Sequence, residues 1–167
     1  MSLIQPDSPS ATLVRADQAE VLGGGPSTIT LLADGRDTGG VISANRSRLA
    51  PGTDGPPPHY HSGSAEIFFV LEGSLQALAG DRVLTLDAGD FLVVPAYLPH
   101  AFGTPEGAGA DVLITFAPGM RDRFDYFRLG ERVMKGQASP REILDNQDRF
   151  DNHFLDSPTW RRARTNP

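Results

Sequence analysis

The chain has 167 residues, of which 39% are hydrophobic and 22% charged, and its net charge is −6. This length and composition are typical of one soluble domain. The scattered acidic charge argues against nucleic acid as a partner, and the absence of cysteine excludes disulfides and thiolate metal ligands. The sequence lacks the pattern of a signal peptide and any apolar run near the roughly 18 residues of a membrane span, which predicts a cytoplasmic protein.

The first two thirds of the chain have the pattern of short strands. Residues 1–10 are polar and contain proline, which predicts a flexible arm. Runs rich in Val, Ile, Thr and Leu then alternate with turn residues, as in a β-sandwich or barrel. The predicted strands are residues 12–16, 27–33, 40–49, 66–73, 74–80, 82–86, 90–95, 100–102 and 111–117. Glu72-Gly73 resembles a hairpin turn. We therefore predict an antiparallel all-β body over residues 11–117.

Residues 118–167 have a different hydrophobic period. Apolar residues recur at helical spacing in the first part, namely Met120, Phe124 and Phe127. Gly130 is placed to end this helix, and a capping box that begins at Ser139 predicts a second one. The tail carries three further large aromatic residues, namely Phe150, Phe154 and Trp160. We expect this helical extension to pack on the barrel or on a second subunit.

Three histidines and one glutamate lie within 42 residues of each other. Because side chains alternate along a strand, His59 and His61 share one face while Tyr60 points the opposite way. Glu66 begins the next predicted strand, and His100 re-enters the sheet after a turn. An ordinary buried histidine is the alternative at each position. Three imidazoles and a carboxylate that converged without an ion would bury polar groups at a cost of several kcal/mol. We therefore predict one divalent metal ion, with Ni, Mn, Co, Fe and Zn all suited to these ligands.

Aromatic residues are predicted around this site. Phe68, Phe102 and Phe116 belong to inward-facing strands, and they are our candidate substrate-binding residues, with a plain core role as the alternative. Glu66 is the candidate catalytic base, with a purely structural ligand as the alternative. The arginines of residues 119–128 are interpreted as a solvated helix face, although they could also bind an acidic substrate. His153 is left outside the site.

The stretch from Thr53 to Thr104 resembles the two sequence motifs of the cupin superfamily. The first motif has the order glycine, H-x-H, glutamate, glycine, and its positions are filled here by His59, His61, Glu66 and Gly73. The second has the order glycine, P-x-G, histidine, asparagine, and it is matched by Gly89, Pro95 and His100. Three positions depart from the motifs, namely Thr53 and Tyr97 in place of glycine and Thr104 in place of asparagine. The resemblance covers roughly residues 40–117.

The resemblance implies a double-stranded β-helix with a C-terminal helical extension, a homodimer, and a metal on His59, His61, Glu66 and His100. Within the superfamily the chain looks most like the bacterial quercetin 2,3-dioxygenase type. In that family the glutamate helps to deprotonate the flavonol, and dioxygen opens the ring with loss of carbon monoxide. The partners implied are a small aromatic substrate and dioxygen. A non-oxidative cyclase or isomerase, and a cupin that binds a small ligand without turnover, are the alternatives.

Overall fold

The computed structural model describes residues 11–165, so the arm predicted at residues 1–10 lies outside the described part of the chain. The strands within it are β1 (Val21–Gly24), β2 (Ser27–Ala33), β3 (Ser43–Leu49), β4 (His59–Tyr60), β5 (Ala65–Ala79), β6 (Arg82–Asp87), β7 (Phe91–Val94), β8 (His100–Gly103), β9 (Ala110–Ala117) and β10 (His153–Phe154). The helices are α1 (Arg123–Met134), α2 (Pro140–Asp145), α3 (Gln147–Phe150) and α4 (Pro158–Thr165).

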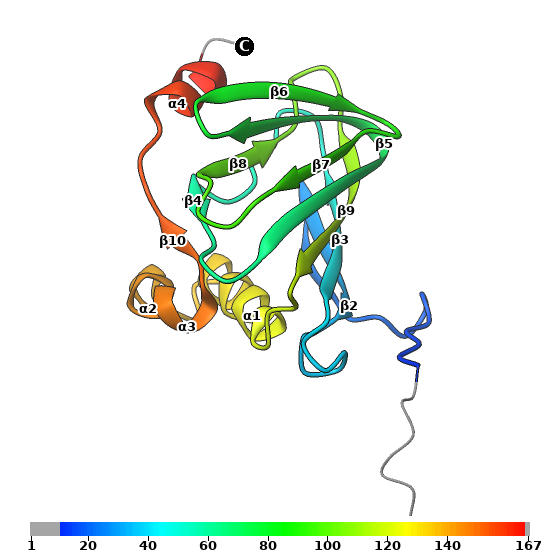
Figure 1. Ribbon diagram of the computed structural model, residues 1–167. Helices are drawn as coiled ribbons and strands as arrows, with labels where there is room; N and C mark the ends of the chain where they lie inside the picture. Colours follow the sequence, from blue (N-terminus) through cyan, green and yellow to red (C-terminus); the bar gives the residue numbers. More distant parts are fainter. Residues whose placement is uncertain (1–10, 166–167) are drawn as a thin grey trace, which may run out of the picture.

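The strands form a barrel of two antiparallel halves that share the long strand β5 (Figure 1). One half has the order β1-β2-β3-β9-β5-β7, and the other has the order β6-β5-β8-β4-β10. Apolar side chains from both halves alternate inward and fill one core. The predicted all-β class with a short C-terminal helical part is thereby confirmed.

The prediction of a hairpin at Glu72-Gly73 is wrong, because β5 continues through these two residues without turning back. Up to Gly73 the strand pairs with β9, and from Ser74 onward it pairs with β6. Gly73 has a φ of 77°, and the register shifts between Val70 and Glu72. A glycine at such a position allows a strand to bend and change partners as well as to turn. Gly73 is therefore the point where β5 passes from one half of the barrel to the other.

Two other predicted boundaries are corrected. Residues 12–16 form no strand, and Leu13 is 68% exposed, because this apolar run has no neighbouring strand with which to pair. Gly130 does not end the first helix, which continues to Met134 and is followed by Gly136 with a φ of 70°. An interior glycine weakens a helix without ending it, whereas the left-handed glycine beyond the last turn terminates it.

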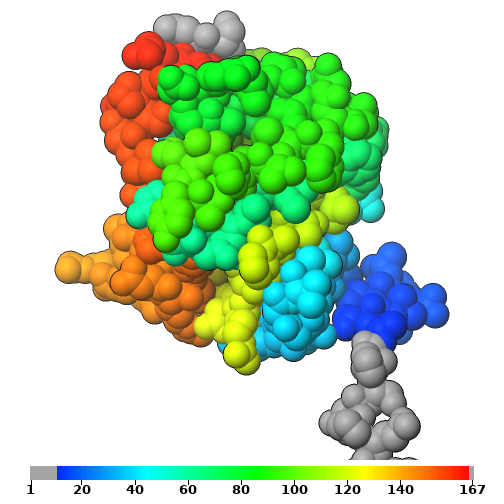
Figure 2. Space-filling model, viewed as in Figure 1, coloured from blue at the N-terminus to red at the C-terminus, as the bar shows by residue number. Residues whose placement is uncertain are grey.

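The C-terminal segment runs along one side of the barrel. Helices α1, α2 and α3 gather at one end of the barrel and α4 lies at the other, with β10 between them (Figure 1). The space-filling view shows the part of this segment that follows α1, in orange and red, lying against the green strands (Figure 2). Ser139 and Glu142 form the predicted capping box of α2. Trp160 of α4 is buried against Leu78 and Ala101. Among residues 11–165, no helix is both long and apolar enough to cross a membrane.

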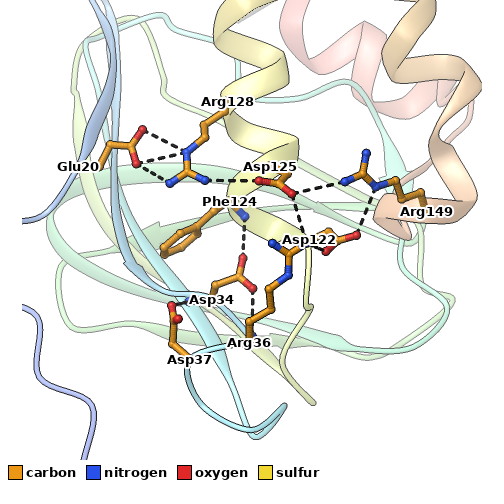
Figure 3. Close-up of polar contacts among 9 residues, drawn as sticks. All are labelled: Glu20, Asp34, Arg36, Asp37, Asp122, Phe124, Asp125, Arg128 and Arg149. Carbon is orange, nitrogen blue, oxygen red and sulfur yellow. Dashed lines mark hydrogen bonds and ion pairs between the residues drawn. The ribbon is translucent and has the colours of Figure 1, made fainter.

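A polar network attaches the first turn of α1 to the sheet and to α3 (Figure 3). The carboxylate of Asp34 accepts a hydrogen bond from the backbone N–H of Phe124, at 3.0 Å, and so satisfies one of the open donors at the start of the helix. Three arginines surround the carboxylates of this region, namely Arg36, Arg128 and Arg149. The network fixes the position of α1 over the end of the barrel.

Candidate metal centre

Four polar side chains converge inside the barrel, and all four are buried. They come from β4, the turn after it, β5 and β8, and they are His59, His61, Glu66 and His100. Their candidate ligand atoms all lie within 4.8 Å of one another. The register explains the convergence, because β4 pairs His59 directly with His100. The structure thus brings together every residue that the sequence predicted as a metal ligand.

The hydrogen bonds of the rings show that these residues suit a metal ion. Each Nδ1 donates to a backbone carbonyl, which leaves the Nε2 lone pair of a neutral ring directed at the centre. Oε2 of Glu66 lies 2.6 Å from Nε2 of His100 and 2.9 Å from Nε2 of His61. Without a proton or a cation between them, the carboxylate oxygen and the two ring nitrogens would face one another as hydrogen-bond acceptors with no donor. Nε2 of His59 is buried and has no partner among the described residues. A cation at the centre would satisfy all four groups.

Burial and mutual charge set the protonation of the cluster. Burial lowers the pKa of His59 well below its ordinary value, and the neighbouring His100 adds to this effect. Burial acts to raise the pKa of Glu66, but the charge of His100 and its hydrogen bond, together with those of His61, outweigh it and hold the pKa well below its usual range. Burial acts to lower the pKa of His100, but Glu66 outweighs it and raises that pKa, so without a cation His100 holds the proton between the two groups, and a bound cation would replace that proton. Glu66 is therefore an anion and His59 a neutral imidazole at neutral pH, which are the forms that bind metals.

A residue of the C-terminal segment supports the cluster. The backbone carbonyl of Asp151 accepts a hydrogen bond from Nδ1 of His61 at 2.5 Å. Its carboxylate accepts hydrogen bonds from the backbone N–H groups of Ser62 and Gly63, at 2.7 and 2.8 Å. These contacts fix the ring of His61 and the turn that follows it. Sequence reasoning missed Asp151, because its distance of 90 residues from His61 leaves no local signal.

The three departures from the cupin motifs keep the backbone that the motifs require. Tyr97 has a φ of 67°, so it takes the left-handed conformation for which the motif uses glycine. Its N–H donates to the carbonyl of His61 at 2.7 Å. Thr53 and Thr104 contact each other, since the N–H of Thr53 donates to Oγ1 of Thr104 at 2.9 Å and that hydroxyl donates to the carbonyl of Ala50. The substitutions therefore leave the strands that carry the histidines in place.

A pocket of about 600 Å³ opens beside the cluster, and Glu66 is part of its lining. Phe102 and Phe116, two of the three aromatic residues expected to contact substrate, also line this pocket. Phe68 lies in the hydrophobic core against Phe102, with ring centroids 5.4 Å apart, and it is not part of the lining. Phe154 lines the pocket as well, 6.1 Å from the ring of His59. The walls are thus mainly aromatic and aliphatic.

The interpretation of the α1 arginines as a solvated face is wrong for Arg123. This residue is buried, it lines the pocket, and its guanidinium packs on the ring of Phe116. Its position at the start of a helix gave no sequence signal of burial, because the rings that cover it come from several elements. His153, which we left outside the site, stacks on Tyr60, whose side chain alternates with those of the ligand histidines.

An antiparallel barrel in which three imidazoles and one carboxylate converge is the arrangement of a protein that could bind a metal ion. Residues 45–116 match the cupin domain family (Cupin_2), so this part of the chain is a cupin domain. It is 33% identical over 91 residues to quercetin 2,3-dioxygenase of Bacillus subtilis. That match covers 54% of this chain and 26% of the relative, so the chain spans about a quarter of that protein.

Solved structures share the fold at low sequence identity. An RmlC-like cupin from Shewanella frigidimarina superposes with a TM-score of 0.56 at 22% identity, over 68% of this chain and 96% of that one. The polyketide cyclase RemF from Streptomyces resistomycificus gives a TM-score of 0.54 at 21% identity, over 74% of this chain and 97% of that one. These similarities establish the barrel architecture.

Proposed function

We propose that this protein is a metal-dependent dioxygenase that acts on a small enolisable phenolic substrate. The observation that carries the proposal is the buried group of three imidazoles and one carboxylate beside a largely apolar pocket. The similarity to quercetin 2,3-dioxygenase over 91 residues supports an oxidative reaction. Both the size of the pocket and its aromatic lining suit a planar ligand.

One divalent ion would be held by four side chains, namely His59, His61, Glu66 and His100. Ni, Mn, Co, Fe and Zn all accept this set of nitrogen and oxygen donors. When bound, such an ion supplies Lewis-acid activation of a substrate oxygen. The backbone carbonyls that accept from each Nδ1 keep the rings oriented, so the protein places the ligands in advance.

Glu66 has the position and charge of a general base. The contacts with the histidines all go to Oε2, so Oε1 has no hydrogen-bond partner among the described residues. The carboxylate is ionised at neutral pH, because its pKa is held low. In the proposed reaction Oε1 takes the proton of the substrate hydroxyl. Phe102 and Phe116 exclude water from the resulting anion and hold the ring of the substrate.

The test begins with elemental analysis of protein purified without added metal. Oxygen consumption is then measured with quercetin, after reconstitution with Ni, Mn, Co or Fe. We expect one metal ion per chain and oxygen uptake matched by carbon monoxide release. The Glu66→Gln variant should retain the fold and lose about 10²-fold to 10⁴-fold in rate, the usual contribution of a general base.

Two outcomes would contradict this proposal. A chain with no bound metal in any preparation would remove its basis. One metal per chain with product formation that is unchanged without oxygen would point instead to a non-oxidative cyclase or isomerase.

We also propose that the protein is a homodimer. Apolar side chains of β5 and β7 are exposed on the outer face of the barrel, and Phe69 pairs in register with Phe91, which is 64% exposed. A second copy would cover this face. Light scattering after size exclusion should give twice the mass of the chain, and Phe91→Lys should shift it toward the monomer while Val41→Lys, a change at another exposed residue, should not. A monomeric wild type at micromolar concentration would refute the proposal.

A further inference from the structure

Arg123, the first residue of α1, lies in the wall of the pocket and is only 5% exposed. Its Cζ lies 4.4 Å from the ring centroid of Phe116, 4.5 Å from that of Tyr126 and 4.8 Å from that of Phe127. Nη1 donates a hydrogen bond to Oδ1 of Asn152 at 3.1 Å. Arg123 is therefore surrounded by aromatic rings and one amide.

Among the described residues the charge of Arg123 has no counter-ion in direct contact, although the carboxylates of Glu66 and Asp151 act on it from a distance. Three arginines close to it in the fold each contact a carboxylate, and they are Arg36, Arg128 and Arg149 (Figure 3). Arg123, in contrast, forms no ion pair with any carboxylate of residues 11–165. Cation–π contacts offset part of the cost of burying a charge, but a guanidinium has five N–H donors and one amide oxygen occupies only one of them.

Each residue of this hydrogen-bonded pair has a buried donor without an acceptor among the described residues. Nε of Arg123 has no hydrogen-bond partner among the described residues, and neither has Nδ2 of Asn152, the amide to which Arg123 is bonded. Native proteins rarely leave such groups unsatisfied unless a ligand or water completes them. Both atoms are donors, so the group that completes them must be an acceptor, and next to a cation it is best an anion.

The position of Arg123 places this anion site within reach of the metal centre. The ring of Phe116 lies 5.4 Å from the ring of His61 and also packs against the guanidinium, so one aromatic ring separates the two. Arg123 and Glu66 line the same pocket. A small ligand with one oxygen at Glu66 can therefore reach Arg123 with a second polar group.

We propose that Arg123, held in place by Asn152, binds an acidic group of the substrate, a carboxylate in the simplest case, and so selects a phenolic or enolisable acid over a neutral flavonol. This inference rests on the proposed function, because it names the substrate class of the same pocket. A guanidinium binds a carboxylate with two parallel hydrogen bonds, which also fixes the orientation of the ring in the pocket.

The test compares the binding of salicylate and of salicylamide, a neutral molecule of nearly the same shape. Dissociation constants are measured by calorimetry for the wild type and for Arg123→Met, both with metal and after its removal. We expect the wild type to prefer salicylate by about tenfold or more, the effect of one well-made charged contact. Arg123→Met should lose that preference. The preference should persist in metal-free wild type, because it comes from the arginine.

Control variants separate a binding role from a structural one. Arg149→Met removes an exposed arginine that also packs on an aromatic ring, Phe150, and it should leave both affinities unchanged. Arg123→Lys keeps the positive charge but cannot form two parallel hydrogen bonds, so it should retain part of the preference for salicylate. This variant provides the comparison if Arg123→Met does not fold.

Equal binding of the two probes by the wild type would overturn the inference, as would an undiminished preference in a folded Arg123→Met variant. Because binding is measured without dioxygen, a failure of quercetin turnover leaves this result intact. Conversely, if the wild type showed no preference for salicylate, its oxygen uptake with neutral substrates would be unaffected, and the proposed function would stand.

Discussion

Replacing His100 with Ala is expected to remove most of the metal from the purified protein. Nε2 of His100 lies 2.6 Å from Oε2 of Glu66, at the centre of the cluster, and the substitution deletes one of four ligands. Changes to residues that only orient a ligand already weaken metal affinity by about 10-fold to 100-fold, so we expect loss of at least about 100-fold here. Elemental analysis after dialysis, with competition against a chromophoric chelator, measures this affinity.

His153→Ala is the matched control for this experiment. His153 is the fourth histidine of the chain, and it stacks on Tyr60 on the side of β4 away from the cluster. Its Nε2 lies 3.1 Å from the carboxylate of Asp151, but the carbonyl of Asp151 that orients His61 is a backbone atom, which the substitution leaves in place. This variant should keep a full equivalent of metal. If His100→Ala also kept one, the assignment of the four ligands would be refuted.

The second large effect is expected for Gly73→Ala. An added Cβ at this position would lie 2.0 Å from the carbonyl oxygen of Gly109, and the φ of 77° is unfavourable for any other residue. Left-handed backbone costs about 1–2 kcal/mol, and overpacking adds about 1–3 kcal/mol. We expect a free energy of unfolding lower by about 2–5 kcal/mol and a Tm lower by about 4–20 °C, measured by circular dichroism.

Gly89→Ala separates the two causes. Gly89 has a φ of 94°, but nothing lies within 4 Å of the position of an added Cβ. This variant therefore meets the backbone cost alone, about 1–2 kcal/mol. Equal destabilisation by the two substitutions would show that the contact between Gly73 and Gly109 does not restrict the fold.

The strands of the barrel could be predicted because each is a short apolar run bounded by turn residues. The prediction of strands and turns failed where the same residue types occur in two different local structures. Gly73 follows a glutamate as it would in a hairpin, yet it bends a continuous strand. Residues 12–16 have strand composition but no partner to pair with. Local sequence records propensity, whereas pairing depends on segments distant in the chain.

The four residues of the cluster could be predicted because alternation and motif spacing place them on one inward face. Arg123 and Asp151 could not. A charged residue at the start of a helix usually faces water, and only the rings packed around Arg123 make it a buried group. Asp151 reaches His61 through its backbone carbonyl, an atom that every residue possesses. Such contacts depend on the docking of the C-terminal segment.

That docking has a consequence for how the protein matures during translation. A nascent chain that has emerged as far as residue 117 already carries all four ligand side chains and every strand from β1 to β9. It lacks the carbonyl of Asp151 that orients His61, and the carboxylate that holds the turn of Ser62 and Gly63. A further 34 residues (151 − 117) must therefore follow residue 117 before the contacts that orient His61 can form, so the cluster is completed only late in the synthesis of the chain.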